Sequence, residues 1–198
     1  MNQKLILVAI SLITVILGVA SPVYAKGTEN MITRLRTNGY HSFEWYHQDG
    51  DTVFPDVYFF EIPNIYHETG VGGGQVIPLT DNYSYGFVAE AYLVSGSTGE
   101  AWLEPALLIW GSEEKWGFNV NIFQYIALNG QANTYTFLDP RVFLGDKKFK
   151  AGMSLTGMLD EHNFSEDHGP FVEFGTEIGA IRLTYKADEL EVALTTSF

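Results

Sequence analysis

The sequence predicts an all-β chain that folds as an antiparallel up-and-down β-barrel of about eight to ten strands. Three observations support this fold class. Apolar residues recur at every second position through most of the chain, which is the period of a β-strand. Several alternating segments run for 9–12 residues, whereas strands of soluble proteins average about 5–6. Clusters of Gly, Asn, Asp and Ser separate these segments, as turns do.

The alternation is clearest in residues 83–94, where one face carries aromatic residues, alanine and leucine while Glu90 and Tyr92 lie on the other. It is weakest in residues 101–110, because Pro105 interrupts a run that is apolar on both faces. An Asp-Gly turn joins the first two predicted strands as a hairpin. The predicted strands are residues 40–47, 52–62, 83–94, 101–110, 116–122, 134–144, 149–159, 172–178, 181–186 and 190–198.

Three segments do not follow the strand pattern. Residues 26–36 show weak helical periodicity, and residues 63–82 form a long connection that contains the glycine-rich run 70–74. This run lacks the Gly-Lys-Ser/Thr of a phosphate-binding loop, so we interpret it as a flexible connection. Residues 160–170 are strongly polar and predict a loop.

The N-terminal 25 residues have the three parts of a secretory signal peptide. Lys4 supplies the positive charge, residues 5–20 form the apolar run, and Val23 and Ala25 are the small residues of a cleavage site. We therefore expect cleavage after residue 25 and a mature chain, residues 26–198, that forms a single β-barrel domain. An uncleaved anchor is the alternative, because the apolar run is slightly long for a signal peptide.

The composition excludes several classes of function. Without residues 1–25, the remaining 173 residues carry ten basic and 24 acidic side chains, a net charge of −14. No cluster of lysine and arginine exists that would bind phosphates, so we do not expect nucleic acid as a partner. The sequence contains no cysteine, so this exported chain has neither disulfides nor a thiol nucleophile.

The last nine residues indicate the class of barrel. Leu190, Val192, Leu194 and the terminal Phe198 lie on one face, and the chain stops on the aromatic residue. This pattern resembles the closing strand of bacterial outer-membrane β-barrels, which ends in Phe and is read by the barrel assembly machinery. Thr196 departs from it, because a large apolar or aromatic residue is common there. The resemblance implies outer-membrane lipid and the assembly machinery as partners and the outer membrane as the location.

A physical argument for a membrane barrel is independent of this resemblance. In lipid every backbone polar group must be paired, so a sheet has to close, with an apolar lipid face and a polar lumen. The same alternation serves a soluble β-sandwich, jelly roll or lipocalin-like barrel whose apolar face points inward. Such a periplasmic or secreted protein would bind or cleave a polysaccharide or lipid. The alternation alone does not distinguish the two folds.

A polar lumen would contain several charged residues. Glu173 and Glu177 share a face, but four strand residues span about 13 Å, too far for the carboxylate pair of a glycosidase. We expect these two residues to face Lys150, Arg182 or Arg141. The predicted acidic excess favours a hydrated lumen with a preference for cations. The expected lumen charges are Glu90, Glu104, Glu173, Glu177, Arg182 and Lys150, accompanied by Glu191 and Lys186.

No residue pattern predicts a catalytic, cofactor-binding or metal site. Residues 160–168 contain four carboxylates and two histidines, but their spacing matches no calcium or zinc motif. No Gly-x-Ser-x-Gly elbow occurs. His47, or His67 near Glu68, could pair with a serine as in barrel-shaped lipid hydrolases, which only geometry would establish. We therefore expect no cofactor and a non-enzymatic outer-membrane protein, either a narrow channel for a small solute or a surface-structural protein.

Overall fold

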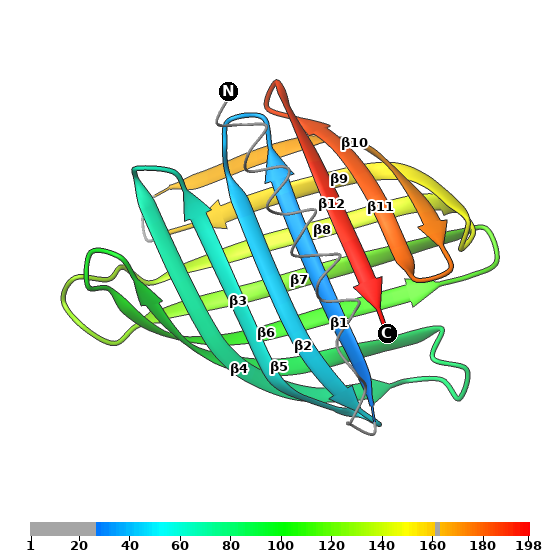
Figure 1. The fold of residues 1–198 in the computed structure, drawn as a ribbon, viewed down its shortest axis with the longest axis horizontal. Coiled ribbons are helices and arrows are strands. Elements are labelled where there is room, and N and C mark those ends of the chain that lie inside the picture. The colour runs from blue at the N-terminus through cyan, green and yellow to red at the C-terminus, as the bar shows by residue number, and fades with distance from the viewer. Residues whose placement is uncertain (1–26, 161–162) are drawn as a thin grey trace.

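The computed structural model describes residues 27–160 and 163–198, and these residues form a closed barrel of twelve antiparallel β-strands (Figure 1). The predicted signal peptide, residues 1–25, lies outside the described residues, so its cleavage stays a prediction. The strands are β1 (Thr28–Arg36), β2 (His41–Asp49), β3 (Thr52–Ile62), β4 (Tyr66–Pro78), β5 (Tyr85–Gly96), β6 (Ala101–Ser112), β7 (Trp116–Ala127), β8 (Tyr135–Gly145), β9 (Phe149–Leu159), β10 (Phe164–Thr176), β11 (Gly179–Lys186) and β12 (Glu189–Ser197).

The predicted antiparallel barrel is confirmed, but the predicted count of eight to ten strands is wrong. Each strand pairs with its neighbours in the chain, and β1 pairs with β12 to close the sheet. Two predicted irregular segments are strands: residues 28–36 form β1 instead of a helix, and most of the expected 63–82 connection is β4. The expected loop at residues 160–170 contains the first half of β10. These segments are strands because they pair with neighbouring strands, and the residue pattern within one segment does not reveal that pairing.

Strand β4 is rich in glycine because large side chains of the neighbouring strands lie across it. Gly70 pairs with Tyr58 on β3, and Gly72 pairs with Tyr92 on β5. A Cβ atom on either glycine would collide with the ring of its tyrosine partner. Glycine in a strand marks such a close approach. The run 70–74 is therefore part of a regular strand, and the prediction of a flexible connection is wrong.

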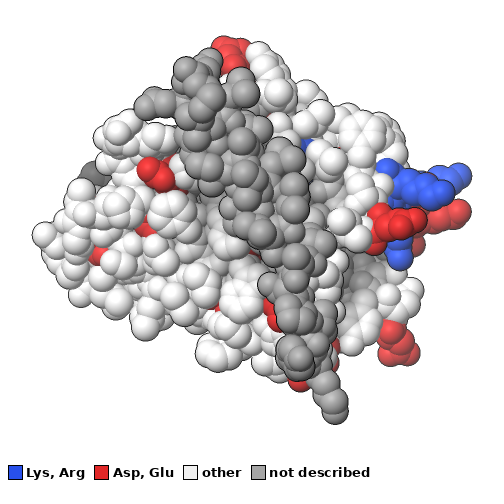
Figure 2. Space-filling view, in the orientation of Figure 1, with Lys and Arg blue, Asp and Glu red and all other residues white. Residues whose placement is uncertain are grey.

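The two faces of the sheet differ in polarity. Apolar side chains on the outer face are well exposed, including Leu93, Val142 and Leu144 at 65%, 59% and 70%. The inner face carries most of the charged residues of the strands, including Glu104, which is 1% exposed. Lys and Arg gather together with Asp and Glu at one end of the view, and most of the other coloured surface that can be seen is uncharged (Figure 2). This arrangement is the reverse of a soluble sandwich, so the soluble alternative is not supported.

The barrel has two ends with short connections. One end holds the start of β1, the end of β12 and the turns that follow the even-numbered strands; we call it the terminal end, and the other the opposite end. The longest connections with every residue described are residues 79–84 at the terminal end and 128–134 at the opposite end. Among the residues that the structure describes, no helix is both long and apolar enough to cross a membrane.

The seam between β1 and β12 completes the hydrogen bonding of the sheet. Its register runs from Asn30 opposite Ser197 to Arg36 opposite Glu191. The terminal residue extends this pairing, because the backbone N–H of Phe198 donates to the Glu29 carbonyl at 3.0 Å and its carbonyl accepts from the Glu29 N–H at 2.8 Å. The last residue of the chain thus contributes two inter-strand hydrogen bonds.

We predict that Gly72→Ala destabilises the barrel. The new Cβ would meet the Ala91 carbonyl and the Tyr92 ring, and overpacking of this kind costs about 1–3 kcal/mol. The midpoint of heat-induced unfolding, followed by the mobility shift of the folded barrel in SDS gels, should fall. Gly130→Ala is the matched control, because its Cβ would meet no atom within 4 Å. Equal midpoints for the two variants would contradict this account of the glycine-rich strand.

Candidate functional site: a charge-divided barrel lumen

The inner face of the barrel is divided into two regions of different charge. The register of adjacent strands places five carboxylates on neighbouring inward positions of β2–β6, which we call the acidic wall. Inward positions on β1, β8, β9 and β11 carry the lysines and arginines of the lumen, which we call the basic wall. The acidic wall consists of Glu44, Asp56, Glu68, Glu90 and Glu104. The basic wall consists of Arg34, Arg36, Arg141, Lys150, Arg182 and Lys186.

Among the described residues, tyrosine hydroxyls contact four of the five carboxylates of the acidic wall, all except Glu44. Tyr58 donates its hydroxyl to Glu104 Oε2 at 2.6 Å, and Tyr66 donates to Glu68 Oε2 at 3.1 Å. Tyr125 reaches the other oxygen of Glu68 at 3.3 Å. Glu68 and Glu104 are 6% and 1% exposed. These acids are therefore held by the sheet and its tyrosines and contribute little charge to the accessible lumen surface.

One tyrosine of this wall lies between two carboxyl groups. The Tyr92 hydroxyl is 2.8 Å from Asp56 Oδ2 and 2.9 Å from Glu90 Oε2. A phenol has a single proton to donate, so it cannot satisfy two ionised carboxylates at once. Asp56 is also 1% exposed. Tyr92 therefore links β5 to β3 at a point where two acids share one donor.

Aromatic rings fill the lumen beside the acidic wall. Trp102 makes edge-to-face contacts with Tyr125 and Tyr135, at ring-centroid distances of 5.9 and 6.4 Å. The two tyrosine rings stack on each other at 4.3 Å. The indole N–H of Trp102 donates to the Asn133 carbonyl at 2.9 Å. This aromatic cluster packs inside the barrel beside the acidic wall, toward the opposite end.

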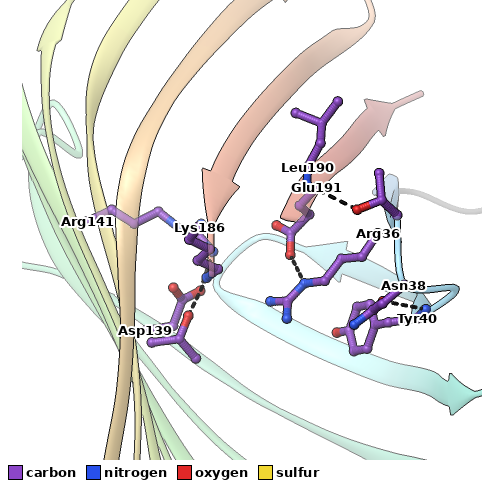
Figure 3. A network of polar contacts seen from close by, with 10 residues as sticks. Arg36, Asn38, Tyr40, Asp139, Arg141, Lys186, Leu190 and Glu191 are labelled. Atoms are coloured by element: carbon purple, nitrogen blue, oxygen red, sulfur yellow. Dashed lines mark hydrogen bonds and ion pairs between the residues drawn. The ribbon is translucent and has the colours of Figure 1, made fainter. Parts of the chain in front are cut away.

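The basic wall contains ion pairs, most of which connect different strands. Arg36 on β1 donates its Nε to Glu191 Oε2 on β12 at 2.8 Å, and Lys186, Asp139 and Arg141 lie beside this pair (Figure 3). The other pairs are Arg34 with Glu44 at 3.6 Å, Lys150 with Glu173 at 2.7 Å, and Arg141 with Asp139. Side chains of this wall remain partly exposed, with Arg34 at 23%, Arg36 at 22% and Lys150 at 30%.

The structure places most of the residues predicted for the lumen on the inner face. Glu90 and Glu104 belong to the acidic wall, and Glu173 contacts Lys150 at 2.7 Å and Arg182 at 3.8 Å. Glu177 differs, because it lies in the turn between β10 and β11 and not on a strand. The predicted closing strand forms most of β12, with Leu190, Val192 and Leu194 on its outer face and Glu191 on its inner face, while Phe198 follows the end of the strand.

Sequence reasoning missed two arginines of the basic wall and three acids of the acidic wall. Arg34 and Arg36 were overlooked because their segment was expected to be helical, although they alternate with Thr33 and Leu35 as strand residues do. Glu68 was placed in a connection. Glu44 and Asp56 lie in strands that were predicted, but their faces could not be assigned to the lumen before the register was known. The expected preference for cations was argued without these two arginines, and it stays a prediction.

The hydrolase hypothesis is not supported by the geometry. His67 and Glu68 are adjacent on β4, so their side chains point to opposite faces of the sheet. His47 lies on the outer face, where its Nδ1 is 2.8 Å from Glu29 Oε1. Residues 161–162 of the acidic segment lie outside the described residues. Within residues 27–160 and 163–198, no group of three or more His, Cys, Asp or Glu side chains is arranged to hold a metal ion.

A closed antiparallel sheet with an apolar outer face and a charged inner face is the architecture of an outer-membrane β-barrel. No family model and no curated protein matches the sequence. Solved structures of outer-membrane proteins share the fold. A KdgM porin in complex with disordered oligogalacturonate aligns with a TM-score of 0.63 at 9% identity, covering 86% of this chain and 98% of the porin chain. A second KdgM porin structure gives 0.62 at 9% identity, covering 86% and 98% of the two chains.

The third neighbour is the outer membrane protein Omp33 of Acinetobacter baumannii, with a TM-score of 0.51 at 13% identity over 87% of this chain and 97% of that chain. Each neighbour is covered almost entirely, so the likeness extends over the whole barrel. At these identities the likeness concerns the fold. The predicted outer-membrane β-barrel class is thereby confirmed at the level of architecture.

We predict that Tyr58→Phe destabilises the barrel by about 1–3 kcal/mol, because the buried Glu104 carboxylate loses its hydroxyl donor. Tyr83→Phe is the control. It removes a similar hydroxyl-to-carboxylate contact, to Asp51 at 3.1 Å, from a side chain that is 51% exposed, and surface changes of this kind stay within about 0.5 kcal/mol. Thermal unfolding in detergent measures both. A loss for Tyr83→Phe as large as that for Tyr58→Phe would show that burial of the carboxylate is not the cause.

Proposed function

We propose that the protein is a non-enzymatic solute channel of the bacterial outer membrane. The single observation that carries this proposal is the partly exposed, charged basic wall inside a sheet whose outer face is apolar. Charged groups in a confined interior must be paired or hydrated. The ion pairs of the basic wall still leave Arg34, Arg36 and Lys150 between 22% and 30% exposed. Water in the lumen follows, and a hydrated lumen that crosses the membrane is a path for solutes.

The structural neighbours support the same function. Two of them are called porins and one is bound to disordered oligogalacturonate. A small hydrophilic solute is the corresponding partner of this chain. The tyrosines and aromatic rings of the acidic wall occupy part of the interior, so we propose a narrow path along the basic wall and no large general pore. A surface-structural role is the competing proposal, and conductance distinguishes the two.

We predict discrete, small conductance steps when the purified, folded protein is added to planar lipid bilayers in KCl. The steps arise because ions pass through the hydrated space beside the basic wall. The same preparation, unfolded by heat before addition, is the control. Folded barrels that insert into vesicles yet carry no current would contradict the channel and favour the surface-structural role.

We also propose the barrel assembly machinery as a partner that reads the C-terminal strand. Removal of Phe198 should lower the amount of folded protein in the outer membrane, because it removes both the terminal aromatic residue and two hydrogen bonds to Glu29. Deletion of Gly130, in the connection between β7 and β8, is the control and should leave the yield nearly unchanged. Equal yields of the two deletion variants in the membrane fraction would contradict the proposed role of Phe198 in assembly.

A further inference from the structure

The basic wall contains more cations than carboxylates that pair with them. Four carboxylates on or beside this wall each have one cation as their nearest partner. The four pairs are Arg34 with Glu44, Arg36 with Glu191, Arg141 with Asp139 and Lys150 with Glu173. Two cations, Arg182 and Lys186, remain without a carboxylate of their own. Both lie on the inner face of β11, four residues apart.

Arg182, the first of these two cations, has no carboxylate among the described residues that it does not share. Its nearest carboxylate oxygen is Glu173 Oε2 at 3.8 Å, and that carboxylate already accepts from Lys150 at 2.7 Å. The Arg182 Nε is buried and has no hydrogen-bond partner among the described residues. Arg141 and Arg34 lie close enough to repel its charge, while Asp139 and Glu191 attract it from a longer distance. A buried guanidinium with an unused donor and like charges around it is costly unless an anion is present.

Lys186 also has no carboxylate within hydrogen-bond distance among the described residues. Its Nζ donates to the Thr156 hydroxyl, which carries no charge. Asp139 and Glu191 attract it from a longer distance, while Arg36 and Arg141 repel it. Asp139 also has one buried oxygen without a partner among the described residues. The other oxygen of Asp139 pairs with Arg141, so Asp139 is not a partner of Lys186 alone.

We propose that Arg182, with Arg141 and Lys186, forms an anion-binding site in the wall of the lumen that takes a carboxylate or phosphate group of a passing solute. This inference rests on the proposed channel function. A guanidinium binds such groups through two parallel hydrogen bonds, and lysine adds a flexible point charge. The site thus slows and selects solutes with an anionic group, while neutral solutes pass without binding.

The test is the current through single open channels in KCl as sodium phosphate or sodium acetate replaces chloride at constant ionic strength. Constant ionic strength is needed because screening alone changes the current. Wild-type channels should show a saturating reduction of current by these anions. Arg182→Gln should raise the half-maximal anion concentration at least tenfold, and Arg182→Lys should give an intermediate value. An unchanged half-maximal concentration in Arg182→Gln overturns the site.

Two further variants separate the site from a general charge effect. Lys147→Gln removes one positive charge from the turn between β8 and β9 at the terminal end and should leave the half-maximal concentration within twofold of wild type. Glu173→Gln removes the carboxylate that Arg182 shares with Lys150, so it should strengthen anion binding several-fold. A weakening in Glu173→Gln, or a loss in Lys147→Gln equal to that in Arg182→Gln, contradicts the proposal.

The anion site can also be tested without measuring conductance. If the folded wild-type barrel carries no current, the proposed channel function fails, and the site is then measured by thermal unfolding in detergent with phosphate against chloride at equal ionic strength. A ligand that binds the folded state raises its stability. Phosphate should raise the unfolding midpoint of wild type and not of Arg182→Gln. Equal shifts in the two proteins overturn the anion site independently of the channel.

Discussion

Closure of the sheet is the constraint on which the rest of the structure depends. A strand edge exposed to lipid would leave backbone groups unpaired, and no water is there to satisfy them. Pairing of β1 with β12 removes both edges, and Phe198 extends this pairing to the last residue through its two hydrogen bonds with Glu29. Once the sheet is closed, every second side chain points into one enclosed space, so the strand period alone sends many polar residues there.

Acidic and basic side chains differ in how far they are buried in the lumen. On β3–β6 the carboxylates accept from tyrosine hydroxyls, as Glu104 does from Tyr58, and the Tyr58 and Tyr92 rings need the glycines of β4 for room. On β1, β8, β9 and β11 the long basic side chains keep part of their surface exposed. Net charge of the sequence is therefore a poor guide to lumen selectivity, because buried and hydrogen-bonded acids contribute little to the accessible surface.

This division links the packing of the barrel to its proposed function. The tyrosine and tryptophan cluster around Trp102 packs beside the acidic wall, and the path that we propose for solutes runs along the basic wall. Ion pairs between strands, such as Arg36 with Glu191 across the β1–β12 seam, hold that wall in place. The two cations without a carboxylate of their own then mark the place where a solute's charge can replace a missing partner.

The sequence by itself determined the fold class, because period-two alternation in long segments such as residues 149–159 is a local property that burial does not alter. It also indicated Glu90, Glu104 and Glu173 as residues of the polar face. It did not reveal β1, β4 or the start of β10, since glycine-rich and polar segments become strands only when neighbours supply pairing and ring contacts. The tertiary structure alone decided which face points inward and which charges meet, because residues as distant as Arg36 and Glu191 become neighbours only when the sheet closes.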